Sequence, residues 1–140
     1  PLYPQPMVMV APAPHPLLRR RAPQIGWAAA VAFEWVLPPP DAPLRRMLVS
    51  WLARQNLAEP ACTMESVSIL ANVSVVRDSN ALAMLPQDTA HHYESLGLVK
   101  VLPLSFEARL PPVSLLRRRE EPAGDSLNSF LQALRAVRPA

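Results

Sequence analysis

Residues 62–86 constrain the fold more than any other part of the chain. We predict a short strand at Cys62–Glu65, followed after Ser66 by a helix whose apolar residues recur at helical spacing. The cluster Asp78-Ser79-Asn80 favours side-chain to backbone hydrogen bonds and predicts the end of that helix. The next apolar run, Ala81–Leu85, is too short for a helix but fits a strand that is buried on both faces. This order predicts two parallel strands joined by a right-handed crossover helix.

The same unit contributes side chains that we predict to be buried. The inward face of its helix is expected to comprise Val67, Leu70, Ala71 and Val75. Cys62, the only cysteine of the sequence, is predicted to be a small buried apolar residue rather than a reactive thiol.

Several features of the sequence predict the compartment. With one cysteine the chain cannot form an internal disulfide, which fits a reducing compartment such as a bacterial cytoplasm. The apolar run Trp27–Phe33 is far too short to span a membrane, and no signal peptide opens the sequence. Because the chain starts at Pro1 without a methionine, we expect it to be an internal piece of a longer protein.

Apolar runs bounded by prolines alternate with helical patterns along the rest of the chain. The 18 prolines stand at the junctions between these runs and not in repeats, so they mark where strands and helices end. Further strands are predicted at 6–11, 34–37, 98–102 and 112–116, and further helices at 25–33, 43–54, 87–96 and 125–137. This alternation predicts an α/β fold with three layers, a Rossmann-like arrangement around a mainly parallel sheet.

Two of the predicted helices have an apolar stripe. The helix at 43–54 is expected to be capped by Asp41 and to carry Pro43 in its first turn. Its inward stripe comprises Leu44, Met47, Leu48, Trp51 and Leu52, and Arg45, Arg46 and Arg54 fall mostly outside it. The closing helix has a second stripe made of Leu127, Phe130, Leu131, Leu134 and Val137.

The net charge of +3 comes largely from clustered arginines. The clusters are Arg19–Arg21, Arg45–Arg46 and Arg117–Arg119. A nucleic-acid-binding surface would interleave such clusters with aromatic residues, and none is interleaved here. We therefore expect solvated arginine side chains and no direct contact with nucleic acid.

Few residues suggest catalysis or metal binding. Three glycines are too few for a dinucleotide-binding or phosphate-binding loop. The pair His91-His92, with Asp88 and Glu94 nearby, offers metal-ligand atoms, but neighbouring helical positions point about 100° apart, so we favour a solvent-facing helix. His15, in the proline loop at 12–16, is predicted to cap local backbone. We therefore expect no enzyme, no cofactor and no metal ion.

Two predicted strand ends could bind a small anion, because helix N-termini with unpaired amides follow them. One is the turn at 37–43, and the other is the loop at 65–68. Ser66 and Ser68 could hydrogen-bond an anion, whereas Asp41 would repel one. The alternative is that Ser66 only caps the helix.

Six segments in order resemble one protein family. They are PLYPQPMVMVAPAPHPL (1–17), WVLPPPDAPLRRML (35–48), ESVSIL (65–70), ALAMLP (81–86), LGLVKVLPL (96–104) and LPPVSLLRRREEPAGDSLNSFLQAL (110–134). Together they resemble the effector-binding region of LysR-type transcriptional regulators, from the hinge onward. The resemblance covers essentially the whole chain. One departure is the segment at 77–80, where many members of the family carry a glycine-rich turn.

The resemblance implies the fold of type 2 periplasmic binding proteins, in which two α/β subdomains joined by crossing strands enclose a small effector. Residues 1–110 would form the second subdomain, and residues 111–140 would be the return strand and C-terminal helix of the first. The residues implied to face the effector are Pro38, Pro39, Pro40, Ser66 and Ser68.

The resemblance also implies partners. The effector would be an organic acid, an aromatic or a sugar-derived metabolite, and the effector domains would form a homodimer or homotetramer in the cytoplasm, without contact with a membrane. DNA would be bound only through a winged helix-turn-helix, which this chain lacks. Two alternatives remain, a stand-alone solute-binding protein of the same fold and a small hydrolase or transferase that uses Ser66 or Cys62.

Overall fold

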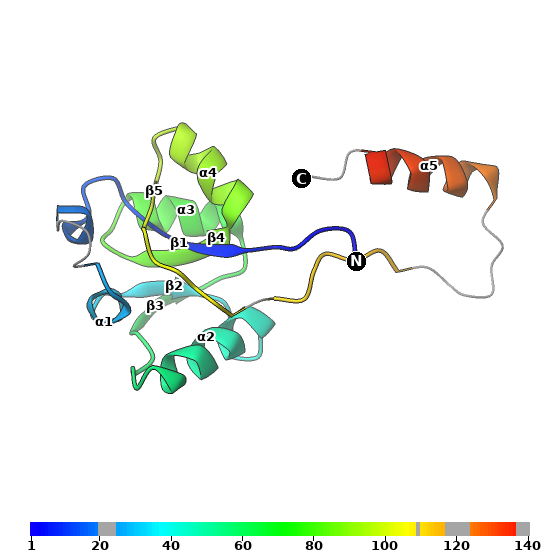
Figure 1. The fold of residues 1–140 in the computed structure, drawn as a ribbon. Helices are drawn as coiled ribbons and strands as arrows, with labels where there is room; N and C mark the ends of the chain where they lie inside the picture. Colours follow the sequence, from blue (N-terminus) through cyan, green and yellow to red (C-terminus); the bar gives the residue numbers. More distant parts are fainter. Residues whose placement is uncertain (20–24, 109, 117–123, 137–140) are drawn as a thin grey trace. The chain divides into compact units, whose positions relative to one another are not determined.

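The computed structural model describes residues 1–19, 25–108, 110–116 and 124–136 (Figure 1). The chain forms two compact units, one of residues 6–110 and one of residues 1–5 with 111–140. The predictions made for Arg20, Arg21, Arg117–Arg119 and Val137 fall outside the described residues.

The larger unit contains a sheet with the strand order β3-β2-β4-β1-β5. The strands are β1 (Met7–Ala11), β2 (Trp35–Leu37), β3 (Cys62–Glu65), β4 (Leu82–Pro86) and β5 (Lys100–Val101). β2 pairs in parallel with both β3 and β4, whereas β1 is antiparallel to β4 and to β5. The parallel direction predicted for β3 and β4 is confirmed, and β2 lies between them. The mainly parallel sheet is also confirmed, with β1 as the reversed strand.

Helices cover both faces of this sheet. The helical segments of the larger unit are η1 (Pro16–Arg19), α1 (Trp27–Ala30), α2 (Pro43–Arg54), α3 (Ile69–Arg77) and α4 (Gln87–Ser95). In Figure 1, α3 and α4 lie on one side of the sheet and α2 lies on the other. The predicted three-layer α/β architecture is therefore confirmed.

Side chains along β1, β2 and β4 alternate between two buried clusters, as expected for the period of two in a strand. In β2, Trp35 and Leu37 belong to the cluster on the α2 side, and Val36 belongs to the cluster on the α3 side. The first cluster also contains Met9, Leu48, Leu52, Leu82 and Met84, and the second contains Val10, Val73, Val76, Ala83 and Leu85. Each layer of helices thus has its own core against the sheet.

The apolar stripe predicted for α2 is confirmed for Leu48, Trp51 and Leu52, which are buried. The prediction that Asp41 caps this helix is wrong. The N-cap residue is Ala42, without a side-chain cap, because the turn before it is closed by a hydrogen bond from the Ala42 amide to the Pro39 carbonyl.

The predicted inward face of α3 is wrong for Val67 and Leu70, which are 75% and 67% exposed, whereas Val75 is partly buried against the core. The fully buried apolar residues of this helix are Val73 and Val76. The helix begins only at Ile69, so Val67 precedes it, and the buried side chains follow a different helical phase.

His15 connects the proline loop at 12–16 to the residue Asn80, which lies just before β4. Its ring is fully buried, and its Nδ1 accepts a hydrogen bond from the Leu17 amide at 3.1 Å. Nε2 therefore carries the proton and donates to the Asn80 carbonyl at 3.1 Å. Burial lowers the pKa of His15, and the hydrogen bond to Asn80 opposes this effect only in part. The predicted role as a capping turn residue is confirmed.

Among the described residues of the smaller unit, the predicted C-terminal helix is present as α5 (Asp125–Ala136). The strand predicted at 112–116 is reduced to a single antiparallel bridge between Tyr3 and Val113. The segment that pairs with Val113 contains only residues 1–5, because the chain enters β1 of the larger unit at Met7. No described residue of α5 is buried.

Candidate functional site

The two predicted anion-binding positions lie at the same edge of the sheet. β2 and β3 are neighbours in parallel, with Leu37 opposite Glu65. Directly after the strands, the Ser66 amide donates a hydrogen bond of 2.9 Å to the Leu37 carbonyl. The structure therefore brings the proline turn at 38–40 and the serine loop at 66–68 together.

The two serine hydroxyls organise the start of α3. The Ser66 Oγ accepts a hydrogen bond from the Ser68 amide at 3.1 Å, and the Ser68 Oγ accepts one from the Ala71 amide at 3.4 Å. Ser68 is thus the N-cap, and the alternative that Ser66 is the cap is wrong. A hydroxyl that accepts a hydrogen bond still has its own hydrogen to donate. Both serines could therefore donate to a ligand oxygen.

The first turn of α3 adds backbone donors beside these hydroxyls. The amides of Ile69 and Leu70 belong to this turn, where no intrahelical carbonyl is available to them. The aligned peptide dipoles also make the start of a helix electropositive. This end of α3 is suited to a negatively charged or strongly polar acceptor.

The proline turn offers carbonyls and ring surfaces but no amide donor. Pro38 and Pro39 are half-buried, and Pro40 is exposed. The Pro39 carbonyl accepts from the Ala42 amide at 2.9 Å, and the Pro38 carbonyl accepts from Nη1 of Arg45 at 3.1 Å. The turn could contact a ligand through its ring surfaces, while the serine loop would supply the hydrogen bonds.

Arg45 is a residue of this region that the sequence pattern does not predict. The apolar stripe of α2 places it mostly outside the inward face, but it is only 8% exposed and also bonds to Glu59. A signal was present in the sequence, because Arg45 precedes Leu48 and Leu52 by three and seven residues and so extends their stripe.

Cys62 is exposed, so the prediction that it is buried is wrong. It lies in β3, which is an edge strand of the sheet and is mostly exposed. Its Sγ lies 3.4 Å from the Met64 carbonyl oxygen and 3.8 Å from Nη1 of Arg45. The edge position of β3 explains the difference.

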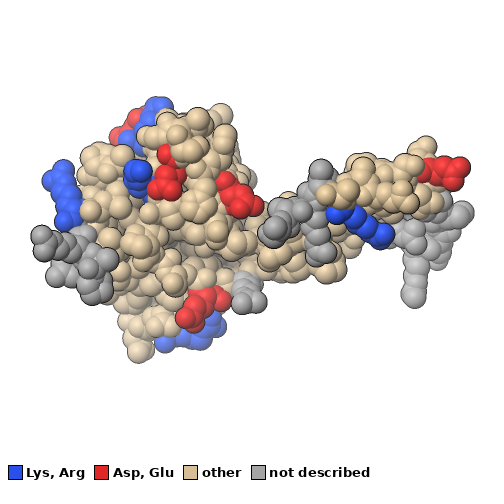
Figure 2. Space-filling view, turned by 45° about the horizontal axis from the view of Figure 1, so that its top comes forward, with Lys and Arg blue, Asp and Glu red and all other residues tan. Residues whose placement is uncertain are grey.

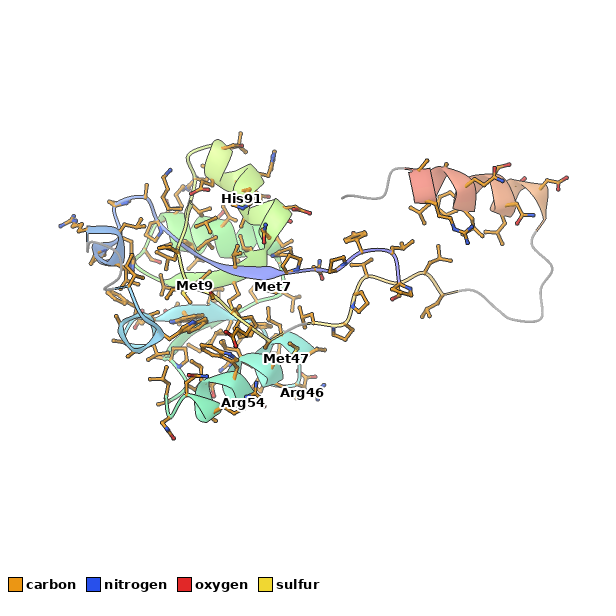
Figure 3. The ribbon with its side chains drawn as sticks, viewed as in Figure 1. Met7, Met9, Arg46, Met47, Arg54 and His91 are labelled. Atoms are coloured by element: carbon orange, nitrogen blue, oxygen red, sulfur yellow. The ribbon has the colours of Figure 1, made fainter. Side chains whose placement is uncertain are left out.

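The charged side chains of the described surface are of both signs. On the face seen in Figure 2, the described acidic and basic side chains of the larger unit are interspersed. Figure 3 shows Arg46 and Arg54 on α2, and both are exposed. These observations agree with arginines that are solvated surface residues.

The histidine pair does not converge on a metal ion. His91 Nδ1 lies 3.5 Å from a carboxylate oxygen of Glu94, whereas the His92 ring packs edge-on against Tyr93. Within the described ranges, no group of three or more His, Cys, Asp or Glu side chains could hold a metal ion. No helix in the same ranges has the length and apolarity needed to cross a membrane.

Comparison with known proteins gives a consistent result. A family model described as "LysR substrate binding domain" matches residues 1–139. The chain is also 23% identical over 123 residues to "HTH-type transcriptional regulator GbpR" of Azospirillum brasilense. That match covers 88% of this chain but only 36% of the curated relative.

Solved regulatory domains have a similar fold. The CcmR regulatory domain of Synechocystis PCC6803, in complex with 2-PG, matches 99% of this chain with a TM-score of 0.74 at 17% identity. The effector-binding domain of QuiR, in complex with shikimate, matches 99% with a TM-score of 0.68 at 20% identity. The chain spans 65% and 63% of these two domains.

Proposed function

The chain belongs to the LysR substrate-binding domain family, and from this membership we propose that it is the small-molecule-sensing part of a bacterial LysR-type transcriptional regulator. The observation that carries the proposal is the hydrogen bond from Ser66 to Leu37, which joins the proline turn to the start of α3. In open α/β sheets, ligands bind at the carboxyl ends of the strands, where these two segments lie.

In this proposal the effector contacts Pro38, Pro39, Pro40, Ser66 and Ser68. The serine hydroxyls and the first-turn amides of α3 bind its acceptor group, and the proline rings contact its carbon skeleton. An organic acid fits these donors better than a neutral molecule, because a carboxylate accepts several hydrogen bonds and is attracted to a helix N-terminus. The complexes of CcmR with 2-PG and of QuiR with shikimate support a small effector in a domain of this fold.

Signalling would follow from a change in subdomain arrangement. We assign residues 1–110 to the second subdomain and residues 111–140 to the return strand and C-terminal helix of the first. The effector stabilises one relative setting of the subdomains by as much as its affinities for the two settings differ. Binding therefore needs no chemical turnover, and the relatives named above are described as regulators or regulatory domains.

The same proposal names partners and a compartment. The whole regulator would form a homodimer or homotetramer through its effector domains and bind DNA through a separate N-terminal domain. A regulator that acts on bacterial DNA works in the cytoplasm. The description of GbpR as an HTH-type transcriptional regulator supports this arrangement.

A binding experiment tests the effector site. It uses the intact protein, by which we mean the whole regulator proposed above and not the 140-residue chain alone. Small carboxylates, including shikimate and benzoate, are first screened for a rise in melting temperature, because a ligand that binds only the folded state stabilises it. The carboxylate that binds best is then titrated into the wild type and into Ser66→Ala by calorimetry.

We expect Ser66→Ala to bind about tenfold more weakly, since it loses a hydrogen bond to a charged group. The control is Ser95→Ala at the C-terminal end of α4, where the hydroxyl donates to the His92 carbonyl of the same helix. Equal affinity of Ser66→Ala and the wild type would remove Ser66 from the site. Failure of every carboxylate to bind the wild type would contradict an organic-acid effector.

A further inference from the structure

Arg45 lies behind the proline turn as a buried cation in the first turn of α2. Its side chain bonds to three segments, namely the Pro38 carbonyl, the Glu59 carboxylate and the Cys62 Sγ. The planar guanidinium has several N–H donors in a fixed geometry, so it can serve partners in different directions at once. Arg45 thus connects the end of β2 to the start of β3.

The proline turn has few other means of attachment. Three consecutive prolines have no amide hydrogen, so the turn can be fixed only through its carbonyls and its packing. The Pro39 carbonyl bonds to the nearby Ala42 amide, which closes the turn locally. The bond from Arg45 to the Pro38 carbonyl instead ties the turn to the body of α2 and, through Cys62, to β3.

The charge on Arg45 is stable in this position. Burial opposes the charged form, but the hydrogen bonds to Glu59 and Cys62 outweigh burial and raise the pKa of Arg45. Glu59 is partly exposed and neutralises the guanidinium. Arg45 therefore stays protonated over the physiological pH range.

We propose that Arg45 is a positioning residue that holds the turn Pro38–Pro40 at the distance from Ser66 that the effector requires. Arg45 donates to the Pro38 carbonyl, and the Ser66 amide donates to the adjacent Leu37 carbonyl, so Arg45 and Ser66 bind neighbouring points of one turn. Arg45 itself does not touch the effector. This inference rests on the proposed function, because it concerns the same effector site.

The experiment separates positioning from general stability by keeping the charges balanced. Removing Arg45 alone would leave Glu59 without its partner, so the main variant is Arg45→Met with Glu59→Gln, which retains the apolar stem and removes both charges. The first control is Glu59→Gln, which keeps the bond from Arg45 to Pro38. The second control is Arg46→Met, which removes the neighbouring exposed arginine. All variants are made in the intact protein.

The first readout is the affinity for the carboxylate that binds the wild type best, measured by calorimetry. We expect the double variant to bind roughly tenfold more weakly, because the turn loses a charge-assisted hydrogen bond. Both controls should stay within about twofold of the wild type, since the bond to Pro38 is intact. A double variant that binds as tightly as the wild type would overturn the inference.

The second readout does not depend on the effector. Hydrogen exchange is followed by mass spectrometry in peptides that contain the Ala42 and Ser66 amides, which bond to the carbonyls of Pro39 and Leu37. We expect faster exchange in these peptides of the double variant and unchanged exchange in α4. Unchanged exchange at both amides, or equally faster exchange throughout the larger unit, would show that Arg45 does not position the turn. If no carboxylate binds the wild type, the proposed effector class is wrong, and the exchange result alone decides the role of Arg45.

Discussion

The helices α2 and α5 have the same length and similar amphipathic sequences but opposite degrees of burial. Each spans 12 residues. In α2, Leu48 and Leu52 are at most 1% exposed, whereas in α5 Phe130 is 57% exposed and no described residue is buried. The difference shows that an apolar stripe predicts a helix, but not whether this chain supplies the surface that covers the stripe.

The same contrast holds for the two units. Residues 6–110 enclose two cores, one on each face of the sheet, whereas the segments 1–5 and 111–116 share a single bridge at Tyr3 and Val113. Most of the apolar burial of the described chain is therefore in the larger unit. Because burial of apolar surface is the main favourable contribution to folding, the stability of the chain should depend on this unit.

The largest difference is expected when one leucine is truncated in each helix. Leu52→Ala removes a fully buried side chain from the core under α2, so it should lower the free energy of unfolding by about 3 kcal/mol. Leu127→Ala on α5, where the leucine is 40% exposed, should cost no more than about 0.5 kcal/mol in the same 140-residue chain. Denaturant titrations of the two variants measure the difference. Similar losses in both would mean that the two helices are equally packed.

A smaller effect is expected at a buried polar contact of the larger unit. His15→Leu removes the hydrogen bonds to Leu17 and Asn80 and leaves both backbone groups unpaired, which should cost about 2 kcal/mol at pH 8. Denaturation of the same chain at pH 8 measures this cost. A loss as small as that of Leu127→Ala would show that the loop at 12–16 is not held by the histidine.

The pH dependence provides the control for His15. Because burial lowers the pKa of His15 in the folded state, the unfolded chain binds the proton first as the pH falls below the ordinary value of 6.5. The contribution of His15 to stability is therefore complete above this pH and is lost below it. The wild type should lose more stability than His15→Leu between pH 7.5 and pH 5.5. Parallel pH curves for the two proteins would contradict a buried neutral imidazole.

The sequence predicts the elements of the larger unit well, because prolines and polar clusters mark where apolar runs end. The strands at Met7–Ala11 and Cys62–Glu65 agree with the prediction to within a residue. The meeting of Leu37 and Ser66 at one sheet edge also follows from two parallel strands with similar ends. These features depend on local pattern and on general rules of sheet topology.

The remaining features depend on tertiary partners that a local pattern does not contain. Cys62 is exposed because β3 is an edge strand. The alternation of side chains along a strand does not determine which strand lies at the edge of a sheet. Arg45 is buried because Glu59, 14 residues later, returns to pair with it. The buried face of α3 differs from the prediction because Val73 and Val76 pack against the sheet, and the spacing of apolar residues does not determine this contact. In each case a contact between distant or competing residues decided the outcome.

The smallest effect in this chain is expected at Phe130, and it tests why α5 is uncovered. In the 140-residue chain, Phe130→Ala should change the free energy of unfolding by no more than about 0.5 kcal/mol, because the ring is largely exposed. We propose that residues 111–140 belong to the first subdomain, most of which lies outside this chain. In the intact protein the same substitution should then cost about 3 kcal/mol, as for a buried phenylalanine.

The paired measurement distinguishes two explanations of the exposed stripe. If α5 packs against the rest of the first subdomain, Phe130→Ala destabilises only the intact protein, whereas Leu52→Ala destabilises both forms by a similar amount. If the cost of Phe130→Ala is equally small in both forms, α5 does not belong to a subdomain core, and the assignment of residues 111–140 is wrong. Leu52 is the matched reference, since its surroundings lie within residues 6–110 and are complete in either form. The exposed stripe of α5 is therefore a quantitative test of the proposed subdomain boundary.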